Sequence, residues 1–169
     1  PDELINCLNS IYIAHKNFDK FNFEICISDN GSNYNILNTI KHFKKKFKKK
    51  IKIINKDILD CYNDFDFSLP IKVFGNLPYN ISTKILTSFI KTDNLKTKFK
   101  KFIFVFQKEV ADRIMAKENT KEYGRLSIIA SWKMYNKKIM DIDPKYFYPK
   151  PKVWSSLMVH TPKSKIENL

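Results

Sequence analysis

Glycine is scarce in this chain, with only three among 169 residues. The three stand far apart, at Gly31, Gly75 and Gly124, so no Gly-x-Gly pattern is present. A loop that packs its backbone against a phosphate or a cofactor needs glycine, because only glycine permits so close an approach. The sequence therefore contains no recognisable glycine-rich cofactor loop.

Cysteine and histidine are equally few, with three of each. They are Cys7, Cys26 and Cys61, and His15, His42 and His160. No two cysteines have the Cys-x-x-Cys spacing of a zinc site, and the histidines are dispersed. We therefore predict no metal site and no disulfide framework. We expect each histidine to be a surface or hydrogen-bonded core residue rather than a metal ligand.

Long apolar runs are also absent. The longest are about five residues, as in Phe102–Phe106, whereas a membrane-spanning helix needs about 20. With 43% hydrophobic residues, the chain is long enough to bury a core and is typical of one globular domain. We predict no membrane partner, and we expect a monomer because no heptad pattern is present.

Positive charge, in contrast, is abundant. The chain has 31 basic and 17 acidic residues, a net charge of +14 and a pI near 9.6. Only Arg113 and Arg125 are arginines, so 31 − 2 = 29 of the basic residues are lysines. This excess suits an RNA partner, but a Lys-, Asn- and Ile-rich chain also results from an AT-rich genome. We expect Arg113 to form a structural ion pair and leave the role of Arg125 open.

The hydrophobic pattern alternates between strands and helices. The predicted strands are Phe21–Ser28, Lys50–Asn55, Ile71–Phe74, Phe102–Phe106, Met134–Asp141 and Trp154–His160. The predicted helices are Tyr34–Phe47, Asn80–Lys91, Gln107–Lys117 and Arg125–Lys133, with a basic loop at Asp93–Lys101. Such alternation predicts a mostly parallel sheet with helices on both faces, whose ligands bind at the carboxyl ends of the strands.

The most informative segment is Val73–Thr83, where a short apolar strand ends in the corner Gly-Asn-Leu-Pro-Tyr and a helix follows. Two oxygens of this corner, the Asn76 side chain and the Leu77 carbonyl, can accept both N–H groups of an adenine amine and free its lone pair. Pro78 restricts the backbone conformation of Leu77, which fixes the direction of the Leu77 carbonyl. Tyr79 can stack on the base, which contributes about 1–3 kcal/mol. An isolated segment of this kind is more often a plain strand-to-helix turn.

Three segments in order resemble the rRNA adenine dimethyltransferases, over about residues 21–162. The first is Val73–Thr83. The second is Phe106–Val110 with Arg113 and Tyr123–Ser127, and the third is Phe147–Val153 with Ser155. The residues of these segments are more similar to the bacterial and organellar branch of the family. The main alternative within the family is the group of macrolide-resistance methyltransferases, which act on large-subunit RNA. The compartment is left open: cytoplasm for a bacterial protein, mitochondrion or plastid-like organelle for an AT-rich eukaryote.

The resemblance implies a Rossmann-like methyltransferase fold with an antiparallel last strand. It also implies dimethylation of adjacent adenosines in small-subunit ribosomal RNA, with S-adenosylmethionine as donor. Asn76 to Tyr79 would then hold the base and Phe147 would stack on its other face. The donor would lie against Asn76, Asp57 and Asp29, although Asp29 is equally explained as a strand-end turn residue.

The RNA partner would be small-subunit ribosomal RNA or an assembling small subunit. Lys108, Arg125, Lys150 and Lys152 are the candidate contacts. The sequence does not say which adenosines are modified.

Two parts of the family pattern are missing, namely the first strand with its glycine-rich loop and the small C-terminal helical domain. We therefore interpret the chain as a fragment: residues 1–20 are unassigned, 21–162 form the catalytic domain, and 163–169 lead towards the missing domain. The first residue is Pro1 rather than Met, which agrees with this interpretation. The alternatives are a non-catalytic RNA-binding or ribosome-assembly protein, a mitochondrial transcription-factor relative, or an enzyme acting on large-subunit RNA or DNA adenine.

Overall fold

The computed structural model describes residues 8–10, 12–13, 25–28, 42–43, 45, 51–54, 56–61 and 70–164. The chain divides into two compact units, Pro1–Cys61 and Tyr62–Leu169. None of the helices among the described residues is long and apolar enough to cross a membrane.

The first unit contains a parallel strand pair. β1 (Ile25–Ser28) lies beside β2 (Ile51–Ile54), with Ile25 opposite Ile51. The short helix α3 (Ile58–Cys61) follows β2. These elements confirm the predicted strands in their described parts. Of the predicted helix Tyr34–Phe47, the described residues 42–43 and 45 are helical, and the rest lies outside the described residues.

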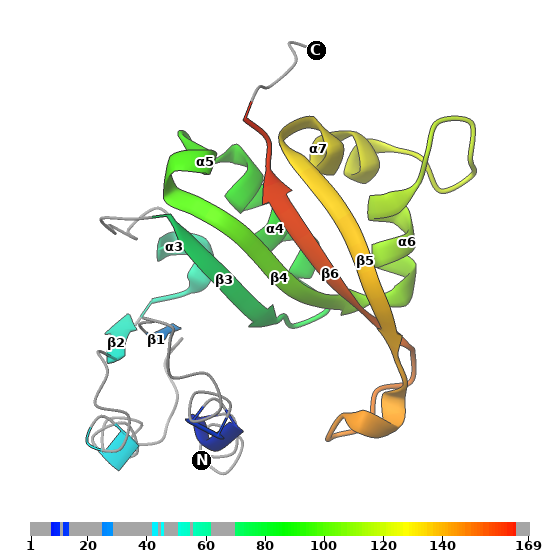
Figure 1. Ribbon diagram of the computed structural model, residues 1–169. Helices are drawn as coiled ribbons and strands as arrows, with labels where there is room; N and C mark the ends of the chain where they lie inside the picture. Colours follow the sequence, from blue (N-terminus) through cyan, green and yellow to red (C-terminus); the bar gives the residue numbers. More distant parts are fainter. Residues whose placement is uncertain are drawn as a thin grey trace. The chain divides into compact units, whose positions relative to one another are not determined.

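The second unit contains a four-stranded sheet with the spatial order β3-β4-β6-β5 (Figure 1). The strands are β3 (Ile71–Asn76), β4 (Phe99–Gln107), β5 (Met134–Ile142) and β6 (Ser155–Pro162). β3 and β4 are parallel, whereas β6 is antiparallel to both of its neighbours. β5 therefore runs in the same direction as β3 and β4, and the predicted antiparallel last strand is confirmed. We call the edge where β3, β4 and β5 end, and where β6 begins, the carboxyl edge.

Three helices form a layer on one face of this sheet (Figure 1). They are α4 (Ser82–Lys91), α6 (Lys108–Met115) and α7 (Arg125–Lys133). The remaining helical pieces are α5 (Leu95–Lys98), before β4, and the single turn η1 (Pro144–Tyr146), between β5 and β6. α7 has the bounds that the sequence predicted, and α4 and α6 lie within their predicted ranges.

The core between the sheet and the helices is aromatic. Alternate residues of β4 (Phe102, Phe104 and Phe106) are buried towards the helices. Phe89 of α4 packs on them, with its ring centroid 4.9 Å from that of Phe102. Burial of such large rings is a dominant stabilising term in a small unit. The core thus lies on the helix side of the sheet and holds the strand ends of the carboxyl edge in register.

The predicted loop Asp93–Lys101 is wrong. Leu95–Lys98 forms α5, and β4 begins at Phe99, three residues earlier than predicted. Leu95 and Phe99 are both buried, at 5% and 1% exposure. The abundance of lysines hid these two anchors, because their burial depends on packing that the local pattern does not contain.

Candidate active site

The corner between β3 and α4 lies at the carboxyl edge. β3 ends at Asn76, and the backbone N–H of Ile81 donates to the Pro78 carbonyl at 3.1 Å, which closes the turn before α4. The Ser82 hydroxyl also donates to the Tyr79 carbonyl at 3.1 Å. No described residue donates a hydrogen bond to the Leu77 carbonyl. The turn is therefore closed, while the carbonyl that the sequence singled out has no partner within the described residues.

Gly75 gives the corner its shape. A Cβ atom at this position would lie 2.7 Å from Leu77 Cδ2 and 3.2 Å from the Phe104 ring. Because Gly75 has no side chain, the end of the Leu77 side chain and the Phe104 ring both lie close to its backbone. A larger residue at this position would displace the Leu77 side chain.

Tyr79 is tied to a distant strand. Its hydroxyl oxygen lies 2.6 Å from Oγ of Ser155, the first residue of β6. Because β4 separates β3 from β6, Tyr79 reaches across the end of β4. Ser155 belongs to the third sequence segment, but the sequence assigned no role to it. The contact brings the first and third segments together at one edge.

The third segment forms the connection between β5 and β6. The Asp143 side chain accepts a hydrogen bond from the Lys145 N–H at 2.8 Å and so caps η1. Phe147 follows η1 and is half-buried, whereas Tyr146 and Tyr148 are 73% and 94% exposed. Phe147 thus lies in the segment that leads to Ser155, and the neighbouring aromatic rings face solvent.

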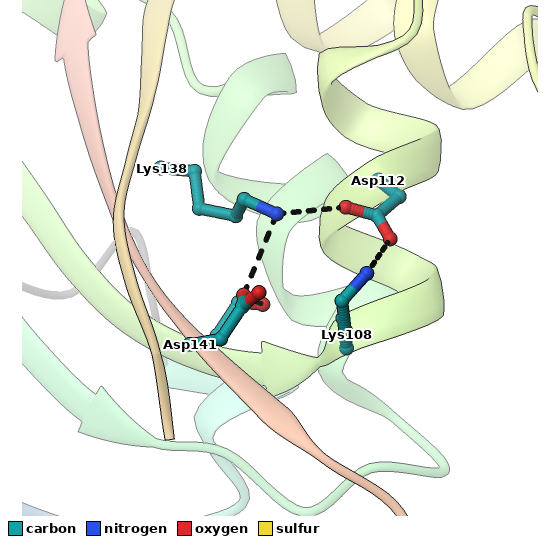
Figure 2. Close-up of polar contacts among 5 residues, drawn as sticks. Lys108, Asp112, Lys138 and Asp141 are labelled. Atoms are coloured by element: carbon teal, nitrogen blue, oxygen red, sulfur yellow. Dashed lines mark hydrogen bonds and ion pairs between the residues drawn. The ribbon is translucent and has the colours of Figure 1, made fainter. Parts of the chain in front are cut away.

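A polar network joins α6, β5 and β6 near the same edge (Figure 2). Asp112 on α6 accepts from Lys108 Nζ at 2.6 Å and from Lys138 Nζ on β5 at 3.0 Å. Lys138 Nζ also lies 3.4 Å from Asp141 Oδ1, which accepts from the Ser156 hydroxyl of β6 at 2.6 Å. We call these five residues the edge network.

Electrostatics within the edge network follow from these contacts. The hydrogen bond from Lys108 lowers the pKa of Asp112, and that from Ser156 lowers the pKa of Asp141. The hydrogen bond to Asp112 raises the pKa of Lys138. Both carboxylates and the ammonium group are therefore held in their charged forms at neutral pH.

The predicted donor-binding residues fall in different places. Asn76 is exposed at the end of β3. Asp57 belongs to the first unit, where its Oδ1 accepts from the Leu59 N–H at 2.9 Å at the start of α3. Asp29 lies outside the described residues.

The predicted RNA contacts are all outside the core. Arg125, Lys150 and Lys152 are exposed, and none of their side chains forms a hydrogen bond or ion pair that the structure shows among the described residues. Lys108 is bound to Asp112 in the edge network. Arg113 pairs with Glu109 one helical turn earlier, on the exposed side of α6, so the ion pair is present but lies on the helix surface. Within the described ranges, no group of three or more His, Cys, Asp or Glu side chains is arranged to hold a metal ion.

Comparisons with known sequences agree on one family. The family model described as ribosomal RNA adenine dimethylase matches residues 35–168. The ribosomal RNA small subunit methyltransferase A of Pelagibacter ubique is 51% identical over 120 residues, which are 71% of this chain and 46% of that protein. The protein of the same name from Wolbachia pipientis wMel is 42% identical over 113 residues, 67% of this chain and 38% of that protein. The chain thus spans less than half the length of these curated relatives.

Two solved structures share the fold. A dimethyladenosine transferase from Plasmodium falciparum has a TM-score of 0.60 at 21% identity, covering 94% of this chain and 62% of that one. The 23S rRNA methyltransferase ErmE has a TM-score of 0.57 at 17% identity, covering 95% and 69%. At these identities the likeness shows the Rossmann-like methyltransferase fold alone.

Proposed function

The chain belongs to the ribosomal RNA adenine dimethylase family, and we propose that it transfers methyl groups to the N6 amine of adjacent adenosines in small-subunit ribosomal RNA. The observation that carries this proposal is the corner at the carboxyl edge. There an exposed amide, a carbonyl without a partner among the described residues and a half-buried tyrosine follow one another. The reaction would be a step of ribosome biogenesis.

In this proposal the corner activates a weak nucleophile. The Asn76 side-chain oxygen and the Leu77 carbonyl accept the two N–H groups of the adenine amine, which draws its lone pair out of the ring. Tyr79 and Phe147 hold the two faces of the base. As the bond from N6 to the methyl carbon forms, the bond from that carbon to the donor's sulfur would break and leave a neutral thioether. Positive charge then develops on the amine, and both oxygens stabilise it. The amine then loses a proton to water.

The methyl donor of the family is S-adenosylmethionine, which supplies an electrophilic methyl group on a sulfonium. The residues present fit such a donor in their chemistry. Asp57 carries a carboxylate that already accepts one N–H, and an adenine amine needs an acceptor of this kind. Asn76 offers a neutral amide at an exposed strand end. We propose that these two residues contact the donor, together with Asp29.

We further propose that the segment 145–154 contacts RNA beside the target base. It contains exposed Tyr146 and Tyr148, and Lys150 and Lys152, which have no ion-pair partner among the described residues. Exposed aromatic rings stack on unpaired bases, and lysines attract the phosphates between them. Arg125 and Lys108 are secondary candidates, and Lys108 would have to leave Asp112 to reach a phosphate.

The test is methyl transfer by the complete protein to small ribosomal subunits that lack the modification, with nucleosides read by mass spectrometry. We expect dimethyladenosine with the wild type and none with Asn76→Ala. The matched control is Asn80→Ala, which removes another exposed amide from the same corner and retains activity. Absence of product with RNA binding retained would instead favour a non-catalytic assembly factor.

A further inference from the structure

Tyr79 is held at both of its ends. At the backbone end, its carbonyl accepts the Ser82 hydroxyl at 3.1 Å, and Pro78 precedes it. At the other end, its hydroxyl lies 2.6 Å from Oγ of Ser155. The tyrosine hydroxyl lies on the axis of its ring, so a contact at this oxygen fixes the direction in which the side chain points from the backbone. The Tyr79 ring is thus placed before any base arrives.

Ser155 is itself a fixed anchor. It is fully buried, and its backbone lies opposite Gln107 of β4 on one side and Ile142 of β5 on the other. An anchor that moves would transmit no orientation to Tyr79. Burial between two strands removes that freedom.

The residues on either side of Ser155 are both joined to Lys108, and Figure 2 shows the side-chain part of this connection. The backbone N–H of Lys108 donates to the Trp154 carbonyl at 2.8 Å. The Lys108 side chain then leads through Asp112, Lys138 and Asp141 to the hydroxyl of Ser156. The edge network therefore fixes the start of β6 from both sides of Ser155.

We propose that Ser155 is a positioning residue, which sets the direction of the Tyr79 side chain and so places its ring where it can stack on the target adenine. The inference rests on the proposed function, because it concerns the base that the corner would hold. Ser155 does not touch the base itself, and it acts only through the Tyr79 hydroxyl. The edge network keeps Ser155 in place.

The test is a double-mutant cycle with Ser155→Ala, Tyr79→Phe and the double variant. Each single change removes the same hydrogen bond and keeps the aromatic ring. We expect kcat/KM for methyl transfer to fall about tenfold in each single variant, mainly through KM, as for loss of one hydrogen bond. The double variant should be no worse than either single one, because the bond is already absent.

A matched control is Ser127→Ala. Ser127 is equally buried, and its hydroxyl donates to the Arg113 carbonyl at 2.8 Å, away from Tyr79. This variant should lower Tm and leave kcat/KM unchanged. If Ser155→Ala behaves in the same way, or if the two single effects multiply in the double variant, Ser155 has only a structural role and the proposal is overturned.

Two further measurements keep the outcome clear. Should Ser155→Ala fail to fold, Tyr79→Phe removes the same hydrogen bond at a residue that is only half-buried. An unchanged kcat/KM in Tyr79→Phe overturns the proposal. Should the wild type transfer no methyl group, the proposed function fails. The same four proteins are then compared in their affinity for the unmodified RNA. Coupling between positions 79 and 155 in that affinity supports positioning, and its absence overturns it.

Discussion

The helix-facing interior of the second unit and its carboxyl edge are held together by different interactions. The interior is a cluster of phenylalanine rings from β4 and α4, with centroid distances from 4.9 Å upwards. The edge is held by short polar contacts, which join Tyr79 to Ser155 and the members of the edge network to one another. Apolar contacts are numerous and tolerant of direction, whereas hydrogen bonds are directional. We therefore expect the interior to contribute most of the free energy of folding, and the edge to set the orientation of the candidate site's side chains.

The largest effect is expected in the interior. Phe102 is fully buried and packs against the rings of Phe89, Phe99 and Phe104. Phe102→Ala leaves a cavity and should lower the free energy of unfolding by about 3–5 kcal/mol, as measured by chemical denaturation. Tyr146→Ala, which truncates a ring that is 73% exposed, should change it by no more than about 0.5 kcal/mol. Similar losses of unfolding free energy in both variants would contradict the conclusion that the buried interior supplies most of the stability.

A pH titration should reveal the polar residue inside the interior. Burial lowers the pKa of His160 from 6.5 to about 4, and its Nδ1 lies 2.7 Å from the Asn136 side-chain oxygen, which can only accept. The neutral ring therefore donates from Nδ1, and Nε2 has no partner among the described residues.

The folded-state pKa of His160 is below its unfolded value. The neutral, buried His160 ring therefore makes its full contribution to the free energy of unfolding above pH 6.5. This contribution is lost as the pH falls towards about 4, and it amounts to about 3 kcal/mol. The free energy of unfolding, measured by denaturation at several pH values, should decline over this window in the wild type. His160→Gln should remove that part of the decline, since the variant has no group to protonate. An identical pH profile in both proteins would show that His160 is not the group responsible.

Gly75 lies where the aromatic interior meets the carboxyl edge, so a substitution there should affect both stability and methyl transfer. Gly75→Ala places a methyl group 2.7 Å from Leu77 Cδ2 and 3.2 Å from the Phe104 ring, so the Leu77 side chain must move and the ring must give way slightly. We expect a loss of about 1–3 kcal/mol in unfolding free energy and a larger fall in methyl transfer than stability explains. Gly124→Ala is the matched control, because a Cβ there meets nothing within 4 Å and the backbone is extended. Equal behaviour of the two variants would argue against a close-packed corner.

The smallest effect on stability is expected in segment 145–154. Tyr148 is 94% exposed, so Tyr148→Ala should leave the unfolding free energy within about 0.5 kcal/mol of the wild type. It should weaken binding of the unmodified RNA by about 1–3 kcal/mol through loss of one stacked base, as measured by a fluorescence titration. Tyr135→Ala, at an exposed position on β5, should leave RNA affinity unchanged. Unchanged affinity in Tyr148→Ala would remove this segment from the proposed RNA surface.

Much of this protein was determined by short stretches of sequence. The start of β3 and the bounds of α7 follow from residue types and spacing within about ten positions, whereas β3 continues beyond the predicted Phe74 to Asn76. The reversed direction of the last strand came from the resemblance of three such stretches to a known family. The candidate base-holding residues were found in the same way, because Asn76, Leu77, Pro78 and Tyr79 are neighbours in the chain.

Only the tertiary structure decided how distant segments meet. β6 is inserted between β4 and β5, and this places Ser155 under the hydroxyl of Tyr79, which is 76 residues earlier in the chain. The edge network likewise joins α6 to β5 across 26 residues and β5 to β6 across 15. A local pattern reports which face of an element is apolar, but it carries no information on which strand lies next to it. The pairing of strands sets those contacts, and with them the orientation of the tyrosine.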